Sequence, residues 1–309
     1  MILPWLRGFL SFEETPLTWT LVAINILFFL ITSGLPSEVP ALSTHDLRWA
    51  GVLYAQFVKE DVQVDSSMLI LKGGQAMQDE KFLDHLETLR IVPGDQVGFE
   101  IFREHARDFR AQIENRPVNV FGLQSGRKRP MTWITYQFMH SGVWHILGNM
   151  LMLLIFAGAL EKLAGPYQVV GIYLMGGIFG AALFLVLSPS STAPMVGASA
   201  SLSAVMAYYA VLEKKQRVRF FFFLSPSKGY WGDIYLPTLL IFPLFFVDDL
   251  SSYLSTAKEI GAGVAYAAHM GGAAFGVLLA LAGRYLCAKD PQWEQILYAS
   301  YSRSQPEAQ

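Results

Sequence analysis

The stretch Val196-Gly197-Ala198-Ser199-Ala200-Ser201 decides how the rest of this chain is interpreted, because it places a serine at the start of an apolar stretch. Two other segments also set polar side chains in or beside apolar surroundings. These are His145-Ile146-Leu147-Gly148-Asn149 and Ala268-His269-Met270-Gly271-Gly272. Polar side chains inside a membrane are costly and usually functional. We therefore expect the three segments to form one site.

The composition predicts that this site lies in a membrane protein. The chain has 309 residues, of which 53% are hydrophobic, and a mean hydropathy of +0.35. Such a chain is too apolar for a soluble domain of its size and indicates a polytopic membrane protein. The net charge of −2 argues against a nucleic-acid partner. The only cysteine, Cys287, excludes an internal disulfide.

The charged residues divide the chain into a membrane body and one insert. Residues 34–130 hold 14 acidic and 12 basic residues, more than half of all charges in the chain. We expect this segment to be a soluble, extracytoplasmic insert. The full division is a cytoplasmic tail at 1–16, a first transmembrane helix at 17–33, the insert at 34–130, a membrane core with helices 2–6 at 131–287 and a cytoplasmic tail at 288–309.

Six apolar stretches are candidate membrane spans, although several are near or below the roughly 20 residues that a perpendicular helix needs. They are Leu17–Thr32, His145–Leu163, Tyr167–Leu187, Ser199–Leu212, Ile234–Val247 and Gly263–Leu286. The first could instead be a signal peptide, but a long acidic stretch precedes it and no clean cleavage site follows. The fifth is the shortest and carries two prolines, so it could be a moving part or a span that the lipid accommodates by thinning.

The basic residues of the short loops predict the orientation. Lys214, Lys215, Arg217 and Arg219 follow the fourth span, whereas the loop from 188 to 196 carries no charge. The positive-inside rule places this cluster and both termini in the cytoplasm. The insert and the starts of the second and fourth spans then face outward.

The insert shows patterns of strands and one helix. Met68–Leu71 is a short apolar run followed by Gly73-Gly74, which is typical of a turn, and Gln78–Arg90 repeats apolar residues at helical spacing. Apolar residues at every second position then predict a β-hairpin that turns near Glu104-His105. They are Val97, Phe99 and Ile101, followed by Phe109, Ala111 and Ile113. The stretch Leu69–Ile113 resembles the second half of a bacterial PDZ domain, which implies a peptide ligand for about 62–117. The alternative is a small α+β decoration of unknown use.

The serine needs a base, because a hydroxyl is a poor nucleophile until its proton is accepted. His269 is the strongest candidate, and Gly272 and Gly276 share its helical face. Small residues on that face would let the helix of Ser199 approach closely. The alternative is that His269 only forms a hydrogen bond between helices.

His145 and Asn149 are four residues apart and therefore share one helical face. Both carry N–H donors, which could stabilise a developing oxyanion. Hydrogen bonding between helices is again the alternative. A zinc site of His140, His145 and His269 is disfavoured, because no HExxH motif is present and residues five apart do not share a face.

Together these residues resemble the rhomboid family of intramembrane serine proteases. The resemblance includes Thr15-Pro16-Leu17-Thr18-Trp19, His145-x-x-x-Asn149, Glu161-Lys162 with Gly165, Gly197-Ala198-Ser199 and Ala268-His269-x-Gly271-Gly272 with Gly276. It implies an all-α, six-helix bundle in which the insert separates helices 1 and 2. It also implies a Ser199–His269 dyad without metal or cofactor, an oxyanion site from Asn149, His145 and the Ser199 backbone N–H, and structural roles for Gly197, Glu161, Gly272 and Gly276. The implied substrates are membrane-anchored proteins cut near the outer face of the bilayer, here expected to be a bacterial inner membrane.

The chain shows two departures from the family pattern, the second of which includes Met131-Thr132 where the family has a Trp-Arg pair. Ala200 replaces a glycine, which a helical φ at this position would tolerate, and Ser203 replaces the aromatic residue that would stack on the catalytic imidazole. A pseudoprotease that binds membrane proteins without cutting them is therefore the alternative function. A channel or transporter is disfavoured, because the spans contain no chain of charged residues and no inverted repeat.

Overall fold

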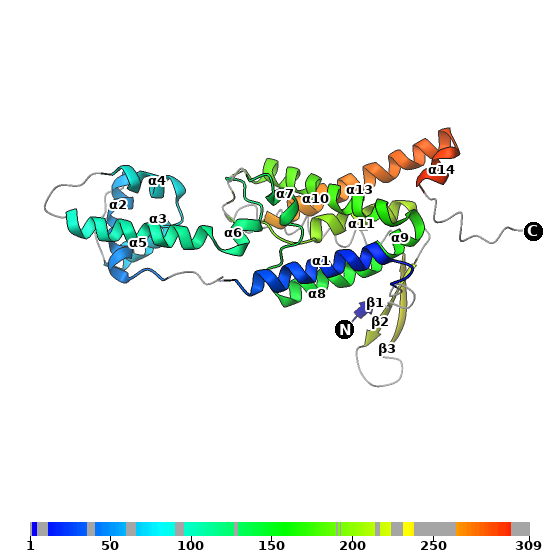
Figure 1. The fold of residues 1–309 in the computed structure, drawn as a ribbon, viewed down its shortest axis with the longest axis horizontal. Helices are drawn as coiled ribbons and strands as arrows, with labels where there is room; N and C mark the ends of the chain where they lie inside the picture. The colour runs from blue at the N-terminus through cyan, green and yellow to red at the C-terminus, as the bar shows by residue number, and fades with distance from the viewer. Residues whose placement is uncertain are drawn as a thin grey trace, which may run out of the picture. The chain divides into compact units, whose positions relative to one another are not determined.

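The structure, a computed structural model, describes residues 2–4, 12–35, 41–59, 66–89, 96–126, 129–189, 191, 193–213, 217–223, 231–237 and 264–297. The chain forms two compact units. One comprises Met1–Leu35 with Phe121–Gln309, and the other comprises Pro36–Val120. The first unit contains the apolar helices, and the second contains most of the charged insert (Figure 1).

The apolar unit is mostly helical. Its main elements are α1 (Pro16–Ser33), α7 (Thr132–Thr135), α8 (Val143–Met152), the π-helix η2 (Leu153–Ala157), α9 (Gly158–Ala164), α10 (Pro166–Leu187), α11 (Ser199–Leu212), α13 (Val264–Lys289) and α14 (Gln292–Leu297). Within the described residues, four segments are long and apolar enough to cross a membrane: Pro16–Ser33, Val143–Ala164, Pro166–Leu187 and Tyr266–Lys289. These segments confirm a polytopic membrane protein, and α11 is a shorter apolar helix at the predicted fourth span.

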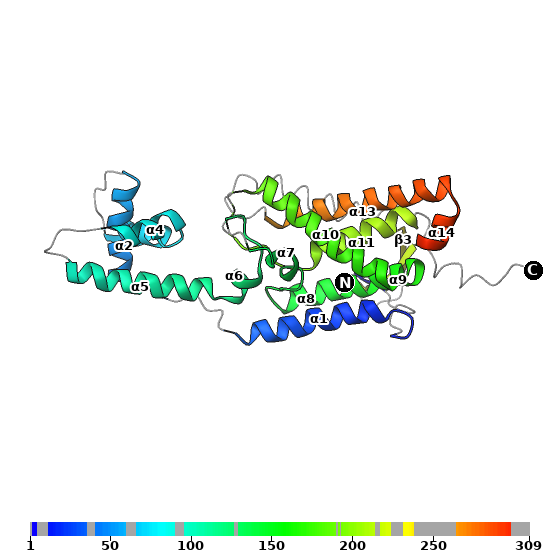
Figure 2. The same cartoon turned by 45° about the horizontal axis from the view of Figure 1, so that its top comes forward.

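The apolar helices pack against one another as one bundle, which Figures 1 and 2 show from two sides. Helix α1 contacts α10 as well as α8, η2 and α9, and α10, α11 and α13 contact one another. The π-helix continues α8 directly into α9, so residues 143–164 form one continuous helical segment. Such π segments inside α-helices occur frequently at functional sites.

A small antiparallel sheet lies where the sequence analysis expected a loop and the start of the fifth span. Strand β2 (Arg217–Phe223) pairs with β1 (Ile2–Pro4) on one side and with β3 (Trp231–Pro237) on the other. The prediction of a helix from Ile234 is therefore wrong for Ile234–Pro237, whose pairing with β2 fixes an extended backbone. The remainder of the expected span, 238–247, lies outside the described residues.

The insert is helical, so the predicted strand and β-hairpin are wrong. Its elements are α2 (Thr44–Phe57), α3 (Ser66–Ala76), α4 (Glu80–Thr88), α5 (Gln96–Glu114) and α6 (Pro117–Phe121). Met68–Leu71 lies in α3, and the expected hairpin turn lies in the middle of α5. No strand occurs among the insert residues that the structure describes, which do not include 90–95. The helices of the insert contradict the PDZ-like interpretation, and the expectation of a peptide ligand rested on that interpretation.

The burial of α5 explains this error. Phe99, Phe102 and Ala106 are buried at helical spacing, whereas Ile101, expected on the same strand face as Phe99, is 51% exposed. Period-2 and period-3.6 patterns agree over a few residues and diverge only over longer stretches. The alternation of three apolar residues was therefore too short to distinguish a strand from a helix.

Ion pairs join α4 to α5 on the surface of the insert. Arg107 Nε lies 2.9 Å from both carboxylate oxygens of Glu87, and Arg110 donates to Asp84 at 2.8 Å. The hydrogen bonds from Arg107 hold the pKa of Glu87 below its usual value. Exposed pairs of this kind contribute little to stability individually.

Candidate active site

The site is built on the contact between α11 and α13. Ser199 begins α11, and His269 lies in the second turn of α13. The His269 Nε2 atom lies 2.6 Å from Ser199 Oγ, which is hydrogen-bonding distance. Both residues are half-buried. The structure thus brings the predicted nucleophile and base together in the geometry that proton transfer requires.

Two glycines of α13 allow this approach. A Cβ on Gly272 would lie 2.0 Å from the carbonyl oxygen of Ala200, and one on Gly276 would lie 2.2 Å from that of Ala204. Both distances are far below any real Cβ contact, so the backbones could not be this close with a side chain at either position. The close packing of these two helices was predicted from the same glycines.

Gly197 holds the turn immediately before the nucleophile. Its φ is +122°, a region that residues with a side chain rarely adopt. Its N–H donates to the carbonyl of Tyr136 at 2.9 Å. A Cβ at this position would lie 2.8 Å from His145 Nε2. Glycine is therefore required both by the backbone and by the imidazole that lies against it.

His145 and Asn149 lie on α8 and face this turn. The point where a Cβ of Gly197 would stand is 2.8 Å from His145 Nε2 and 3.7 Å from Asn149 Nδ2. Asn149 is buried, and its Nδ2 has no hydrogen-bond partner in the described part of the chain. A buried amide N–H without a partner is costly. The His145 imidazole and the Asn149 amide thus converge beside Gly197, two residues before the serine, and the amide is left unsatisfied.

Glu161 lies away from this site, near the start of α1. Its carboxylate accepts hydrogen bonds from the backbone N–H of Leu17 at 3.0 Å and of Thr18 at 2.7 Å, and from the Thr18 hydroxyl at 2.6 Å. These N–H groups lie in the first turn of α1, where backbone N–H groups have no hydrogen-bond partner within the helix. A negative charge at a helix N-terminus is also favourable. Glu161 therefore fastens α9 to α1.

The two departures from the family pattern are accommodated locally. Ala200 lies in α11, and it is not among the described residues with positive φ. Its methyl lies 2.8 Å from where a Cβ of Gly180 would stand, so glycine in α10 gives it space. The Ser203 hydroxyl donates to the carbonyl of Ser199 at 2.9 Å. The Tyr266 ring contacts the His269 ring edge-to-face at 6.4 Å.

Tyr266 and Gln137 are two neighbours of the site that the sequence analysis missed. The spacing of Tyr266 from His269, three residues on one helix, could have revealed the first contact. Buried Ser201 donates to Gln137 Oε1 at 2.9 Å, and Gln137 Nε2 donates to the carbonyl of Trp133 at 2.9 Å. Gln137 thereby ties the start of α11 to the segment that precedes α8. Nothing local in the sequence indicates this contact.

His140 lies against His145, but one of its ring nitrogens is directed to a backbone carbonyl. Its Nδ1 lies 3.1 Å from the Phe138 carbonyl, and its ring contacts that of His145 edge-to-face at 5.1 Å. Burial, followed by the proximity of His145, lowers the pKa of His140 to about 4. His140 is therefore neutral at pH 7. Within the described residues, no group of three or more His, Cys, Asp or Glu side chains is placed to hold a metal ion.

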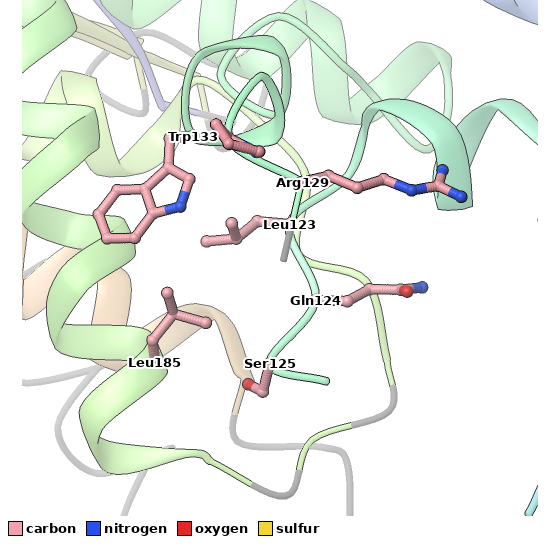
Figure 3. A pocket seen from close by; sticks show the side chains of 7 residues that line it. Leu123, Gln124, Ser125, Arg129, Trp133 and Leu185 are labelled. Carbon is pink, nitrogen blue, oxygen red and sulfur yellow. The ribbon is translucent and has the colours of Figure 1, made fainter. Parts of the chain in front are cut away.

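A cavity of about 490 Å³ is lined by residues 123–125, 129–130 and 133, and by Leu185 near the end of α10. Figure 3 shows Trp133, Leu123 and Leu185 around the hollow, with the guanidinium of Arg129 pointing away from it. Leu123 exchanges two backbone hydrogen bonds with Met195, two residues before Gly197. None of the lining residues belongs to the Ser199–His269 pair, so this cavity is separate from the candidate chemistry.

Comparisons with known proteins give a family match and related proteins. A match to the family described as "Rhomboid domain" covers residues 127–286, slightly more than half of the chain. RHOMBOID-like protein 12, mitochondrial, of Arabidopsis thaliana is 23% identical over 242 residues, covering 72% of this chain and 66% of that protein. Rhomboid-related protein 2 of Mus musculus is 34% identical over 84 residues, covering 26% of this chain and 27% of that protein.

These relatives bear on localisation as well as on family. The chain spans just under two thirds of the plant protein and about a quarter of the mouse protein. Both are eukaryotic, so the expectation of a bacterial inner membrane finds no support in them. The apolar helices and the family match agree on an integral membrane protein. The chain belongs to the rhomboid family.

Proposed function

We propose that this protein is an intramembrane serine endopeptidase with Ser199 as nucleophile and His269 as general base. The observation that carries the proposal is the 2.6 Å contact between His269 Nε2 and Ser199 Oγ. A nucleophile and a base within hydrogen-bond reach are the minimum requirement for covalent catalysis by serine.

The proposed reaction uses this pair twice. Ser199 Oγ attacks the scissile carbonyl carbon while His269 accepts the hydroxyl proton. When the C–N bond breaks, His269 returns that proton to the leaving amine, and an acyl-enzyme remains. Water, deprotonated by His269, then attacks the ester carbonyl carbon. As the ester C–O bond breaks, His269 returns that proton to Ser199 Oγ, and the carboxylic acid product leaves. Asn149 Nδ2 and His145 Nε2, which lie beside Gly197, would stabilise the oxyanion of each tetrahedral intermediate.

The substrates we propose are membrane-anchored proteins cut near the outer face of the bilayer. The site lies at the starts of α8 and α11, and the basic cluster at 214–219 follows α11. By the positive-inside rule these starts face outward. We further propose six spans; of the fifth, predicted at Ile234–Val247, residues 238–247 lie outside the described residues.

The proposal is tested by cleavage of a single-span protein co-reconstituted with this chain in liposomes. Ser199→Ala and His269→Ala should each abolish cleavage, because nucleophile and base act as a unit. Asn149→Ala should cost about 10²–10³ in rate if its amide is a typical oxyanion donor. If the wild type captures such proteins without cutting them, and Ser199→Ala captures them equally well, the pseudoprotease alternative is correct.

A further inference from the structure

The Ser141 side chain contacts His145 and has no role in the site described so far. Ser141 Oγ lies 3.0 Å from His145 Nδ1, four residues further along the chain. Ser141 is exposed and precedes Gly142, the residue that caps α8. The cap of α8 uses no side-chain hydrogen bond. The Ser141 hydroxyl is therefore directed to the imidazole and does not cap the helix.

The other nitrogen of the same ring faces the candidate oxyanion site. His145 Nε2 is the atom nearest to the point where a Cβ of Gly197 would stand, at 2.8 Å. The unsatisfied Asn149 Nδ2 lies 3.7 Å from that point. No hydrogen bond joins His145 Nε2 to any residue that the structure describes. The two ring nitrogens thus have different surroundings.

The protonation of these nitrogens decides what His145 can do. In a neutral imidazole one nitrogen carries a proton and the other accepts a hydrogen bond. An oxyanion is stabilised only by a donor, so Nε2 must carry the proton. A serine hydroxyl can donate to Nδ1 or accept from it. When it donates, Nδ1 carries no proton and the ring proton is on Nε2.

We propose that Ser141 is a positioning residue that holds His145 in the tautomer with its proton on Nε2, aimed at the oxyanion. This inference rests on the proposed protease function, and it assigns Ser141 no contact with substrate. His140 does not take this role, because its Nδ1 is directed to the Phe138 carbonyl and its ring meets His145 edge-to-face.

The kinetic test is a double-mutant cycle on the reconstituted full chain. Ser141→Ala should lower kcat by about 10- to 100-fold, part of the loss expected for one oxyanion donor, with KM changed less than twofold. Ser141→Thr, which keeps the hydroxyl, should restore most of the rate. In a His145→Ala background, Ser141→Ala should have no further effect, because residues that act through each other are not additive. An equal loss in both backgrounds, or an effect on KM alone, would overturn the proposal.

A second readout does not depend on activity. In protein labelled with ¹⁵N-histidine, the ring nitrogen shifts of His145, assigned by their absence in His145→Ala, should indicate a proton on Nε2. In Ser141→Ala they should move toward the other tautomer, whereas Ser33→Ala, an exposed serine bonded within α1, should leave them unchanged. Unchanged His145 shifts in Ser141→Ala would overturn the role of Ser141. If the wild type does not cleave but these shifts move, the protease function fails while the positioning contact stands.

Discussion

In two helix pairs of this protein, glycines let the two backbones approach closely. One pair is α11/α13 in the membrane body, and the other is α2/α3 in the insert. In the first, Gly272 and Gly276 lie against the carbonyl oxygens of α11. In the second, a Cβ on Gly73 would lie 1.9 Å from the carbonyl of Leu47, and one on Gly51 would lie 2.1 Å from that of Leu69. Each pair approaches to a distance that any side chain would prevent.

The difference between the pairs lies in what the close approach achieves. Between α11 and α13 it places Ser199 against His269. Between α2 and α3 it contributes to a small hydrophobic core that includes Ala50, Leu53 and Ala76. The same close packing therefore brings the proposed nucleophile and base together in one unit and contributes to a hydrophobic core in the other. Substitutions at matched glycines should separate these two consequences.

The largest effect is expected from Gly272→Val. Its side chain must displace the α11 backbone, and a misplacement of about 1 Å in an active site can cost about 10²-fold in rate. Liposome cleavage assays should show at least that loss. Gly171→Ala is the matched control, because a Cβ on this α10 glycine meets nothing within 4 Å. Wild-type activity in Gly272→Val would show that the close contact is not needed.

Gly73→Val should destabilise the insert and leave cleavage nearly unchanged for a minimal membrane substrate. Overpacking of a tight contact typically costs about 1–3 kcal/mol. Hydrogen exchange of α2 and α3 in the full chain should report faster exchange. Gly74→Ala is the control, since a Cβ there meets nothing within 4 Å and alanine favours the helix. Equal exchange in both variants would contradict the packing role of Gly73.

As the pH is lowered, the membrane body should begin to lose stability at a higher pH than the insert. The pKa of His140 is about 4 in the fold and about 6.5 in an unfolded chain. The unfolded state therefore binds more protons between these values, and stability should fall as pH drops from about 6.5 to about 4. For Glu87 the lowered pKa gives stability that is lost only as pH falls below its ordinary carboxylate value.

Thermal unfolding of the detergent-solubilised protein between pH 7.5 and 4.5 measures this order. The Tm should decline across the range, and His140→Gln, which cannot titrate, should flatten the decline. Glu87→Gln should leave the slope in this range unchanged. If His140→Gln retains the wild-type slope, His140 is not the group responsible.

The smallest effect is expected from Ala200→Gly, which restores the family residue. Glycine costs up to about 1 kcal/mol of helix stability relative to alanine, and the methyl contact next to Gly180 is lost. Because Ala200 is accommodated within α11, kcat should change by less than about threefold. This is well under the change of about 1.4 kcal/mol in activation free energy that a factor of ten represents. A rise of tenfold or more would show that alanine impairs the wild-type site.

The sequence could predict most of the membrane body, because long apolar stretches set their own boundaries. It also indicated which polar residues meet, since Gly272 and Gly276 share a helical face with His269. In the insert the adjacent Gly73-Gly74 was interpreted as a turn, because among polar residues a glycine pair more often marks a turn than a helix contact. The pairing of β1 with β2 and the Gln137–Ser201 contact depend on partners far apart in the chain, which no local pattern encodes.

The most direct test of the account is to locate the adduct of a fluorophosphonate on the reconstituted protein by peptide mass mapping. The account predicts a single serine adduct, on Ser199, that is lost in His269→Ala and strongly reduced in Gly272→Val but retained in Gly73→Val. An adduct on another serine, or full labelling of Ser199 in His269→Ala, would contradict the claim that the packing of α11 on α13 creates the reactive serine.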